Sequence, residues 1–124
     1  MKKYILLFIL LPFIISCSSD ENTDTPNDNN LLVGTSWKGR HMEDLAFYYK
    51  YTFNDKSECI VEYSNFEDFR NSAKNNRLYE LKNNNLIIKS IANETLIKGI
   101  VNPSEEKIYF YNRYGTPDIF LRIK

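Results

Sequence analysis

The chain has 124 residues, equal numbers of basic and acidic side chains (16 each), nine tyrosines, eight phenylalanines and only four glycines. This length suits a single domain, and an aromatic-rich composition with few glycines favours strands over a disordered or fibrous chain. Two of the basic side chains, Lys2 and Lys3, precede the domain. The remainder has no cationic surplus, so nucleic-acid binding lacks electrostatic support.

Residues 1–16 have the pattern of a secretory leader. Lys2 and Lys3 are followed by an apolar run from Tyr4 to Ile15. This run is shorter than the about 20 residues that a helix needs to cross a bilayer. A basic start followed by a short apolar run predicts a signal peptide that is removed.

The end of this run, Ile14-Ile15-Ser16-Cys17, resembles the lipobox of bacterial lipoproteins. The resemblance implies cleavage between Ser16 and Cys17 and attachment of acyl chains, such as palmitate, to Cys17. Several acyl chains, at about 0.8 kcal/mol per buried methylene, would hold the protein at a membrane. An ordinary leader that happens to end before a cysteine is the alternative. Lipidation of Cys17 would leave Cys59 without a disulfide partner.

Residues 17–30 are predicted to form a lipidated cysteine followed by a disordered tether. Positions 18–30 contain four acidic residues and no basic or apolar ones, a composition that cannot form a core. A coil of this length spans roughly 20 Å. Ser18-Ser19-Asp20-Glu21 resembles the acidic stretch that directs lipoproteins of Bacteroidetes-type bacteria to the outer face of the outer membrane. A plain solvated linker is the alternative. The expected location is the outer membrane, and because both readings stay open, the domain could face the periplasm or the cell surface.

Residues 31–124 are predicted to form one all-β domain. Short segments with alternating side chains are separated by turn-favouring residues such as Asn83-Asn84-Asn85 and Gly115-Thr116-Pro117, which is typical of antiparallel strands. The expected strands are 34–41, 46–53, 58–63, 77–81, 86–90, 95–101, 107–111 and 119–123. Turns of hairpin length predict an up-and-down meander, and closure into a small barrel would remove its exposed edges.

Alternation also predicts which side chains face the interior, because successive strand side chains point in opposite directions. Charged neighbours are taken to mark the outer face. The expected inward side chains are Phe47, Tyr49, Tyr51 and Phe53 in one strand, Cys59, Val61 and Tyr63 in the next, and Ile119, Leu121 and Ile123 in the last. Between positions 64 and 76, Asn65 could cap one short helix that carries Phe66 and Phe69 as a seal or lid for the barrel.

The opening sequence Leu32-Val33-Gly34-Thr35-Ser36-Trp37-Lys38-Gly39 and the closing Phe120-Leu121-Arg122-Ile123 resemble the lipocalin-like domains of small Bacteroidetes lipoproteins. The resemblance implies that Trp37 closes one end of the barrel and that Arg122 covers it through a cation–π contact. The spacing here is Gly-x-x-Trp where lipocalins have Gly-x-Trp, and the domain is shorter than a typical lipocalin.

No catalytic residue, metal site or cofactor is predicted. His41 is the one histidine and is expected to be a solvated loop residue. Cys59 is expected to be a buried thiol that behaves as a small hydrophobe. Carboxylate pairs such as Glu105-Glu106 lack the buried acid and opposed base that hydrolysis requires. The protein is therefore expected not to be an enzyme.

Two functions are consistent with these features. In the first, a lipid-anchored barrel binds a small hydrophobic ligand among Tyr49, Tyr51, Tyr63 and Phe110. In the second, a filled barrel docks another envelope protein through outward residues expected at Tyr48, Ile60 and Phe120. An eight-stranded barrel is only just wide enough to be filled by its own side chains, which slightly favours a solid core.

Overall fold

A computed structural model describes residues 31–124 of the protein. The predicted signal peptide, the predicted lipidation site at Cys17 and the predicted tether all lie outside the described residues. Among the described residues, no helix combines the length and the apolar character needed to cross a bilayer.

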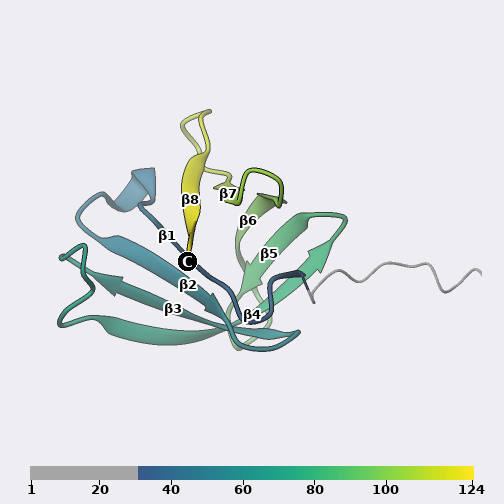
Figure 1. Ribbon diagram of the computed structural model, residues 1–124, viewed down its shortest axis with the longest axis horizontal. Helices are drawn as coiled ribbons and strands as arrows, with labels where there is room; N and C mark the ends of the chain where they lie inside the picture. Colours follow the sequence, from purple (N-terminus) through teal and green to yellow (C-terminus); the bar gives the residue numbers. More distant parts are fainter. Residues whose placement is uncertain (1–30) are drawn as a thin grey trace, which may run out of the picture.

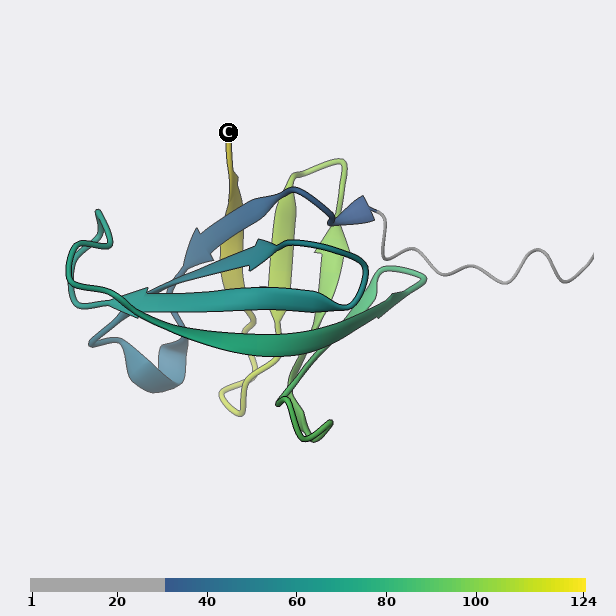
Figure 2. The ribbon, with the colours of Figure 1, turned by 90° about the horizontal axis from the view of Figure 1, so that it is seen from below.

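The domain is a closed antiparallel barrel of eight strands in sequence order (Figures 1 and 2). Each strand pairs with the next, and β8 pairs with β1 to close the ring. The strands are β1 (Ser36–Gly39), β2 (Tyr48–Phe53), β3 (Glu58–Ser64), β4 (Ala73–Lys82), β5 (Asn85–Lys89), β6 (Thr95–Asn102), β7 (Lys107–Phe110) and β8 (Asp118–Ile123). The predicted all-β meander is confirmed. β4 begins four residues earlier than expected, because the chain before Arg77 pairs with β3.

The short helix predicted at 65–70 is wrong. The connection between β3 and β4 is a series of turns in which Phe69 and Asn71 have positive φ angles. The buried Ser64 hydroxyl donates to the Arg70 carbonyl at 2.7 Å and accepts from the Phe66 N–H at 3.0 Å. A helix of one turn is costly to nucleate, and these bonds satisfy the backbone in another way.

The two phenylalanines of this connection do not seal the barrel. Phe66 is exposed beneath the Arg70 guanidinium, and Phe69 lies below the Lys50 ammonium on the outer surface. A 3-10 turn, η3 (Met42–Asp44), lies instead between β1 and β2.

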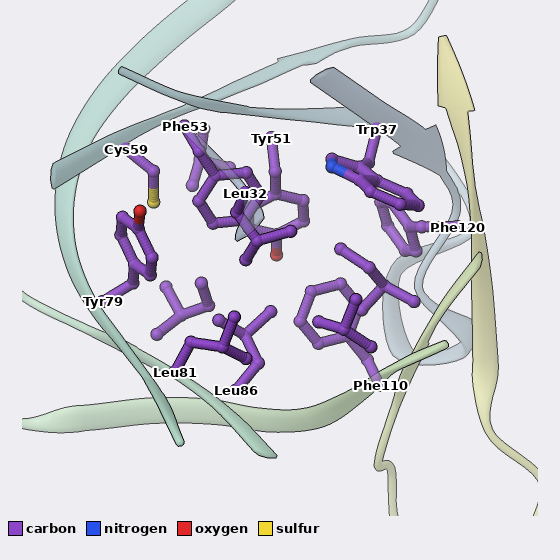
Figure 3. Close-up of a cluster of buried hydrophobic side chains, with 14 residues drawn as sticks. Leu32, Trp37, Tyr51, Phe53, Cys59, Tyr79, Leu81, Leu86, Phe110 and Phe120 are labelled. Atoms are coloured by element: carbon purple, nitrogen blue, oxygen red, sulfur yellow. The ribbon is translucent and has the colours of Figure 1, made fainter. Parts of the chain in front are cut away.

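The barrel interior is filled with large apolar side chains (Figure 3). Ring contacts such as Phe53 with Tyr79 (centroids 4.8 Å apart) and Phe110 with Phe120 (5.1 Å) run through it. The buried residues are Leu32, Trp37, Tyr51, Phe53, Cys59, Val61, Tyr79, Leu81, Leu86, Ile88, Val101, Ile108, Phe110 and Phe120. The expected inward positions of β2 and β3 are confirmed for Tyr51, Phe53, Cys59 and Val61.

The facing predicted for β8 is wrong. Phe120 is fully buried, whereas Ile119 and Leu121 are 46% and 52% exposed. The inward face of β8 is therefore Asp118, Phe120 and Arg122, in which the two charges occupy opposite ends of the barrel. Phe120 packs over Gly39 of β1, where an added Cβ would lie 2.9 Å from the ring.

One end of the barrel is closed by Leu32 and Trp37, which are both buried. The Trp37 indole N–H donates to the Thr35 hydroxyl at 2.7 Å, so this polar group is satisfied inside the core. Arg122 is the register partner of Trp37, and both line a small cavity of about 40 Å³. The Arg122 guanidinium lies 3.7 Å from the Glu106 carboxylate.

Candidate functional site

The other end of the barrel is open and carries a cavity of about 500 Å³, here called the mouth pocket. Its walls come from η3 and the residue before it, from the start of β2, from the start of β6 and from the connection between β7 and β8. The lining residues are His41, Glu43, Asp44, Tyr49, Thr95, Leu96, Ile97, Lys98, Tyr111, Asn112 and Asp118.

His41 lies at the base of this pocket and is held at both ring nitrogens. Its Nδ1 is 3.0 Å from Asp118 Oδ2, and its Nε2 is 2.8 Å from the Tyr51 hydroxyl. With a carboxylate at Nδ1, the neutral ring donates to Asp118 and accepts the Tyr51 O–H. The side chain is only 12% exposed, so the prediction of a solvated loop histidine is wrong.

Asp118 connects three segments of the chain. Its side chain is nearly buried, and its second oxygen accepts from the Met42 N–H at 3.0 Å and from the Asn112 amide at 2.8 Å. A buried carboxylate is costly unless hydrogen bonds replace its water. These three donors supply that replacement, and they fix η3 and the β7–β8 connection to the start of β8.

Four aromatic rings surround the His41 imidazole. Its centroid is 4.8 Å from that of Tyr49, 4.9 Å from Phe120, 5.4 Å from Phe110 and 5.9 Å from Tyr51. Burial among these rings lowers the pKa of His41 below its usual value, although Asp118 opposes the shift. Burial also raises the pKa of Tyr51. At neutral pH the imidazole is uncharged and the phenol keeps its proton.

The four residues predicted to line a ligand site fall into two groups. Tyr49 lines the mouth pocket, where its hydroxyl donates to Asp44 at 2.7 Å, and Tyr63 lies beside it with ring centroids 5.9 Å apart. Tyr51 and Phe110 are buried in the filled core below. They support the pocket floor through their contacts with His41.

The pocket combines apolar walls with an excess of carboxylates. Leu96, Ile97 and the Tyr111 ring supply apolar surface. Glu43, Asp44 and Asp118 face a single lysine, Lys98, among the lining residues, and Glu43 is also 3.6 Å from Arg113. This arrangement suits a small molecule with an apolar body and an end that donates hydrogen bonds or carries positive charge.

Two further kinds of site were considered for the described part, a metal site and a reactive thiol. Within residues 31–124, no three histidine, cysteine, aspartate or glutamate side chains are grouped closely enough to hold a metal ion. Cys59 lies inside the barrel, and burial raises the pKa of its thiol to about 12, although the Arg77 charge opposes this shift.

Sequence reasoning missed Asp118, Asn112 and the β6 residues of the pocket. His41 and Asp118 are 77 positions apart, so no local spacing connects them. The closing pair of strands, β1 and β8, brings them together. The one local signal for this site was the position of Asp118, a charged residue at the start of β8.

No family model, no curated protein and no solved structure matches this chain. Its function is therefore inferred from its own residues and their geometry.

Proposed function

We propose that this protein is a lipid-anchored lipoprotein of the bacterial outer membrane that binds a small ligand at the mouth of its barrel and catalyses no reaction. The lipobox ending in Ser16 and Cys17 supports the anchor. The mouth pocket above His41 supports the binding role.

The position of the ligand follows from the filled interior. Tyr51 and Phe110 pack against one another with ring centroids 5.0 Å apart, and both are buried. Side chains therefore fill this part of the core. In this proposal a ligand would bind above them, between Tyr49 and the start of β6. Its apolar body would contact Ile97 and Tyr111, and its donor end would face the carboxylates of η3.

The direction of the tether fits this use of the barrel. Leu31 lines the small cavity beside Trp37 and Arg122, and β8 runs from Asp118 at the mouth to Arg122 at this closed end (Figure 2). A tether joined to Leu31 would leave the mouth pointing away from the attachment point.

A binding role accounts for the His41 network better than catalysis does. Both imidazole nitrogens are occupied, by Asp118 and by Tyr51, and the Tyr51 hydroxyl is buried. A general base must reach the proton that it removes. Neither nitrogen of His41 is free to accept a proton from a molecule in the pocket, so this network serves to position the pocket walls.

Ligand binding can be tested by NMR on the mature, lipidated protein in nanodiscs. We expect 2-phenylethylamine to shift the amide resonances of Thr95 to Lys98, and 3-phenylpropionate, which has a similar body and the opposite charge, to shift them much less. Thr95→Trp, at the exposed rim, should abolish the shifts. Thr116→Trp, in the β7–β8 connection outside the pocket, is the matched control. Equal shifts with both probes, or shifts that survive Thr95→Trp, would contradict this site.

The anchor can be tested by metabolic labelling with palmitate. Cys17→Ala should remove the label, because the thiol that receives the lipid is lost, whereas Cys59→Ala should keep it. Label that persists in the Cys17 variant would end the lipoprotein proposal. Protease treatment of intact cells would then distinguish a surface-facing domain from a periplasmic one.

The alternative, a filled barrel that docks another envelope protein, stays a prediction, but the residues expected to form its docking surface are less exposed than expected. Of the outward residues expected to serve it, Phe120 is buried, and Tyr48 and Ile60 are half-buried.

A further inference from the structure

The outer surface of β1, β8, β7 and β6 is apolar and cationic, and is here called the β8 face. Strand register arranges it in two rows. Lys38, Leu121 and Lys107 are direct neighbours across β1, β8 and β7. Ile119, Tyr109 and Ile100 are neighbours across β8, β7 and β6. Ile119, Leu121 and Ile100 are 46%, 52% and 38% exposed, so the face presents contiguous apolar groups to its surroundings.

The lysines of this face are not neutralised. Lys38 and Lys107 take part in none of the ion pairs of the described residues. On the opposite side of the barrel two lysines are neutralised, since Lys50 pairs with Glu62 at 3.1 Å and Lys89 with Glu80 at 2.6 Å.

Two carboxylates lie close to the β8 face and do not cancel its charge. Glu105 accepts a hydrogen bond from the Tyr109 hydroxyl, so it faces Tyr109 and is paired with neither lysine of this face. Glu67 lines a groove of about 380 Å³ beside β8, together with two cations, Lys38 and Arg40. Apolar walls from Ile119, Leu121 and Phe69 complete this groove. The net charge of the face and its groove is positive.

We infer that the β8 face docks on the anionic surface of a lipid bilayer. Isoleucine and leucine side chains would enter the boundary between headgroups and acyl chains, and Tyr109 would sit at that boundary with its hydroxyl outward. Lys38 and Lys107, on either side of Leu121, would meet lipid phosphates. Charge complementarity favours an anionic surface. The inference rests on the proposed anchor only for proximity, since a tether of roughly 20 Å would hold the barrel beside the membrane.

The test places the photo-crosslinking residue p-benzoylphenylalanine at Leu121 of the full chain. The matched position is Leu78, an outward leucine of β4 on the other side of the barrel. Vesicles contain phosphatidylcholine with or without phosphatidylglycerol. We expect about tenfold more lipid adducts at position 121 than at position 78, and only with phosphatidylglycerol. Lys38→Glu combined with Lys107→Glu should reduce these adducts by at least about tenfold. Lys74→Glu combined with Lys82→Glu, on β4, makes the same charge change and should reduce them little.

Three results would overturn the inference: equal lipid adducts at both positions, no adducts at 121, or crosslinks from 121 to a second protein chain in place of lipid. Flotation of the wild-type and Cys17→Ala chains with vesicles of phosphatidylcholine alone, which the β8 face is not expected to bind, reports the anchor separately. If flotation does not depend on Cys17, the anchor is wrong, and the adduct pattern still decides the docking face. Circular dichroism of each variant verifies that the barrel is intact.

Discussion

At the scale of single residues, His41 shows how tertiary contacts change the chemistry of a side chain. An isolated histidine beside Met42-Glu43-Asp44 would keep a pKa near 6.5, the ordinary value for an imidazole in water. In the barrel it is packed among four aromatic rings and bonded to Asp118 and Tyr51. Burial destabilises the charged imidazole by more than the Asp118 carboxylate stabilises it, so the neutral form is favoured.

This burial predicts a pH-dependent stability. Because burial lowers the pKa of His41 in the folded state below 6.5, the unfolded chain binds more protons between the two pKa values. The unfolding free energy should therefore be constant above about pH 7 and fall as the pH is lowered through 6.5. The slope cannot exceed about 1.4 kcal/mol per pH unit for one proton. Urea denaturation at a series of pH values measures it.

The control is simple because the chain has one histidine. His41→Gln should remove the pH dependence between about pH 5 and pH 7, where carboxylates are largely ionised. It should also lower the stability at neutral pH, since Asp118 loses a buried partner. A slope that is unchanged in His41→Gln would assign the titration to other groups.

At the scale of secondary-structure elements, β8 is the strand whose facing could not be taken from its own sequence. Both of its faces contain apolar residues, and the charges of one face made it look exposed. These charges were Arg122 and Lys124, and in the barrel both lie at the closed end, near Glu106. Asp118, expected in the preceding turn, begins the strand at the other end and is bonded to His41. Phe120 lies between the two ends, in the core.

Two alanine substitutions distinguish the faces of β8. Phe120→Ala should cost about 3–5 kcal/mol, because it leaves a cavity against Tyr51 and Phe110. Leu121→Ala, next to it on the exposed side, should cost at most about 1 kcal/mol. Thermal or urea unfolding of the two variants measures the difference. A larger loss for Leu121→Ala would show that the strand faces the other way.

At the scale of the whole molecule, the ring of eight paired strands leaves no free sheet edge in the described part. Such a barrel is expected to open as a unit. Cys59 reports on this opening, because it is 1% exposed and its thiol pKa is raised to about 12 by burial. It lies on β3, paired between β2 and β4.

We therefore expect Cys59 to react with a thiol reagent only through global unfolding. The free energy obtained from the labelling rate should equal that from urea denaturation. Phe120→Ala lies several strands away, yet it should speed labelling about 100-fold or more if it costs about 3 kcal/mol. Labelling that does not respond to Phe120→Ala would indicate a local opening near β3.

Local patterns in the sequence were enough to predict the number and order of the strands, the positions of most turns, the inward face of β2 and the burial of Cys59. These features follow from alternation and turn-forming residues, which act over a few neighbouring positions. The resemblance of residues 14–17 to a lipobox is also local, and the lipidation that it implies stays a prediction.

Contacts between distant parts of the chain set the facing of β8, the turns at 65–72 in place of a helix, the solid interior and the mouth pocket. The physical reason is closure. Pairing β1 with β8 brings His41 beside Asp118 across 77 positions, and Gly39 beneath Phe120. These contacts exist only when the ring is complete, so no segment of the chain carries them alone.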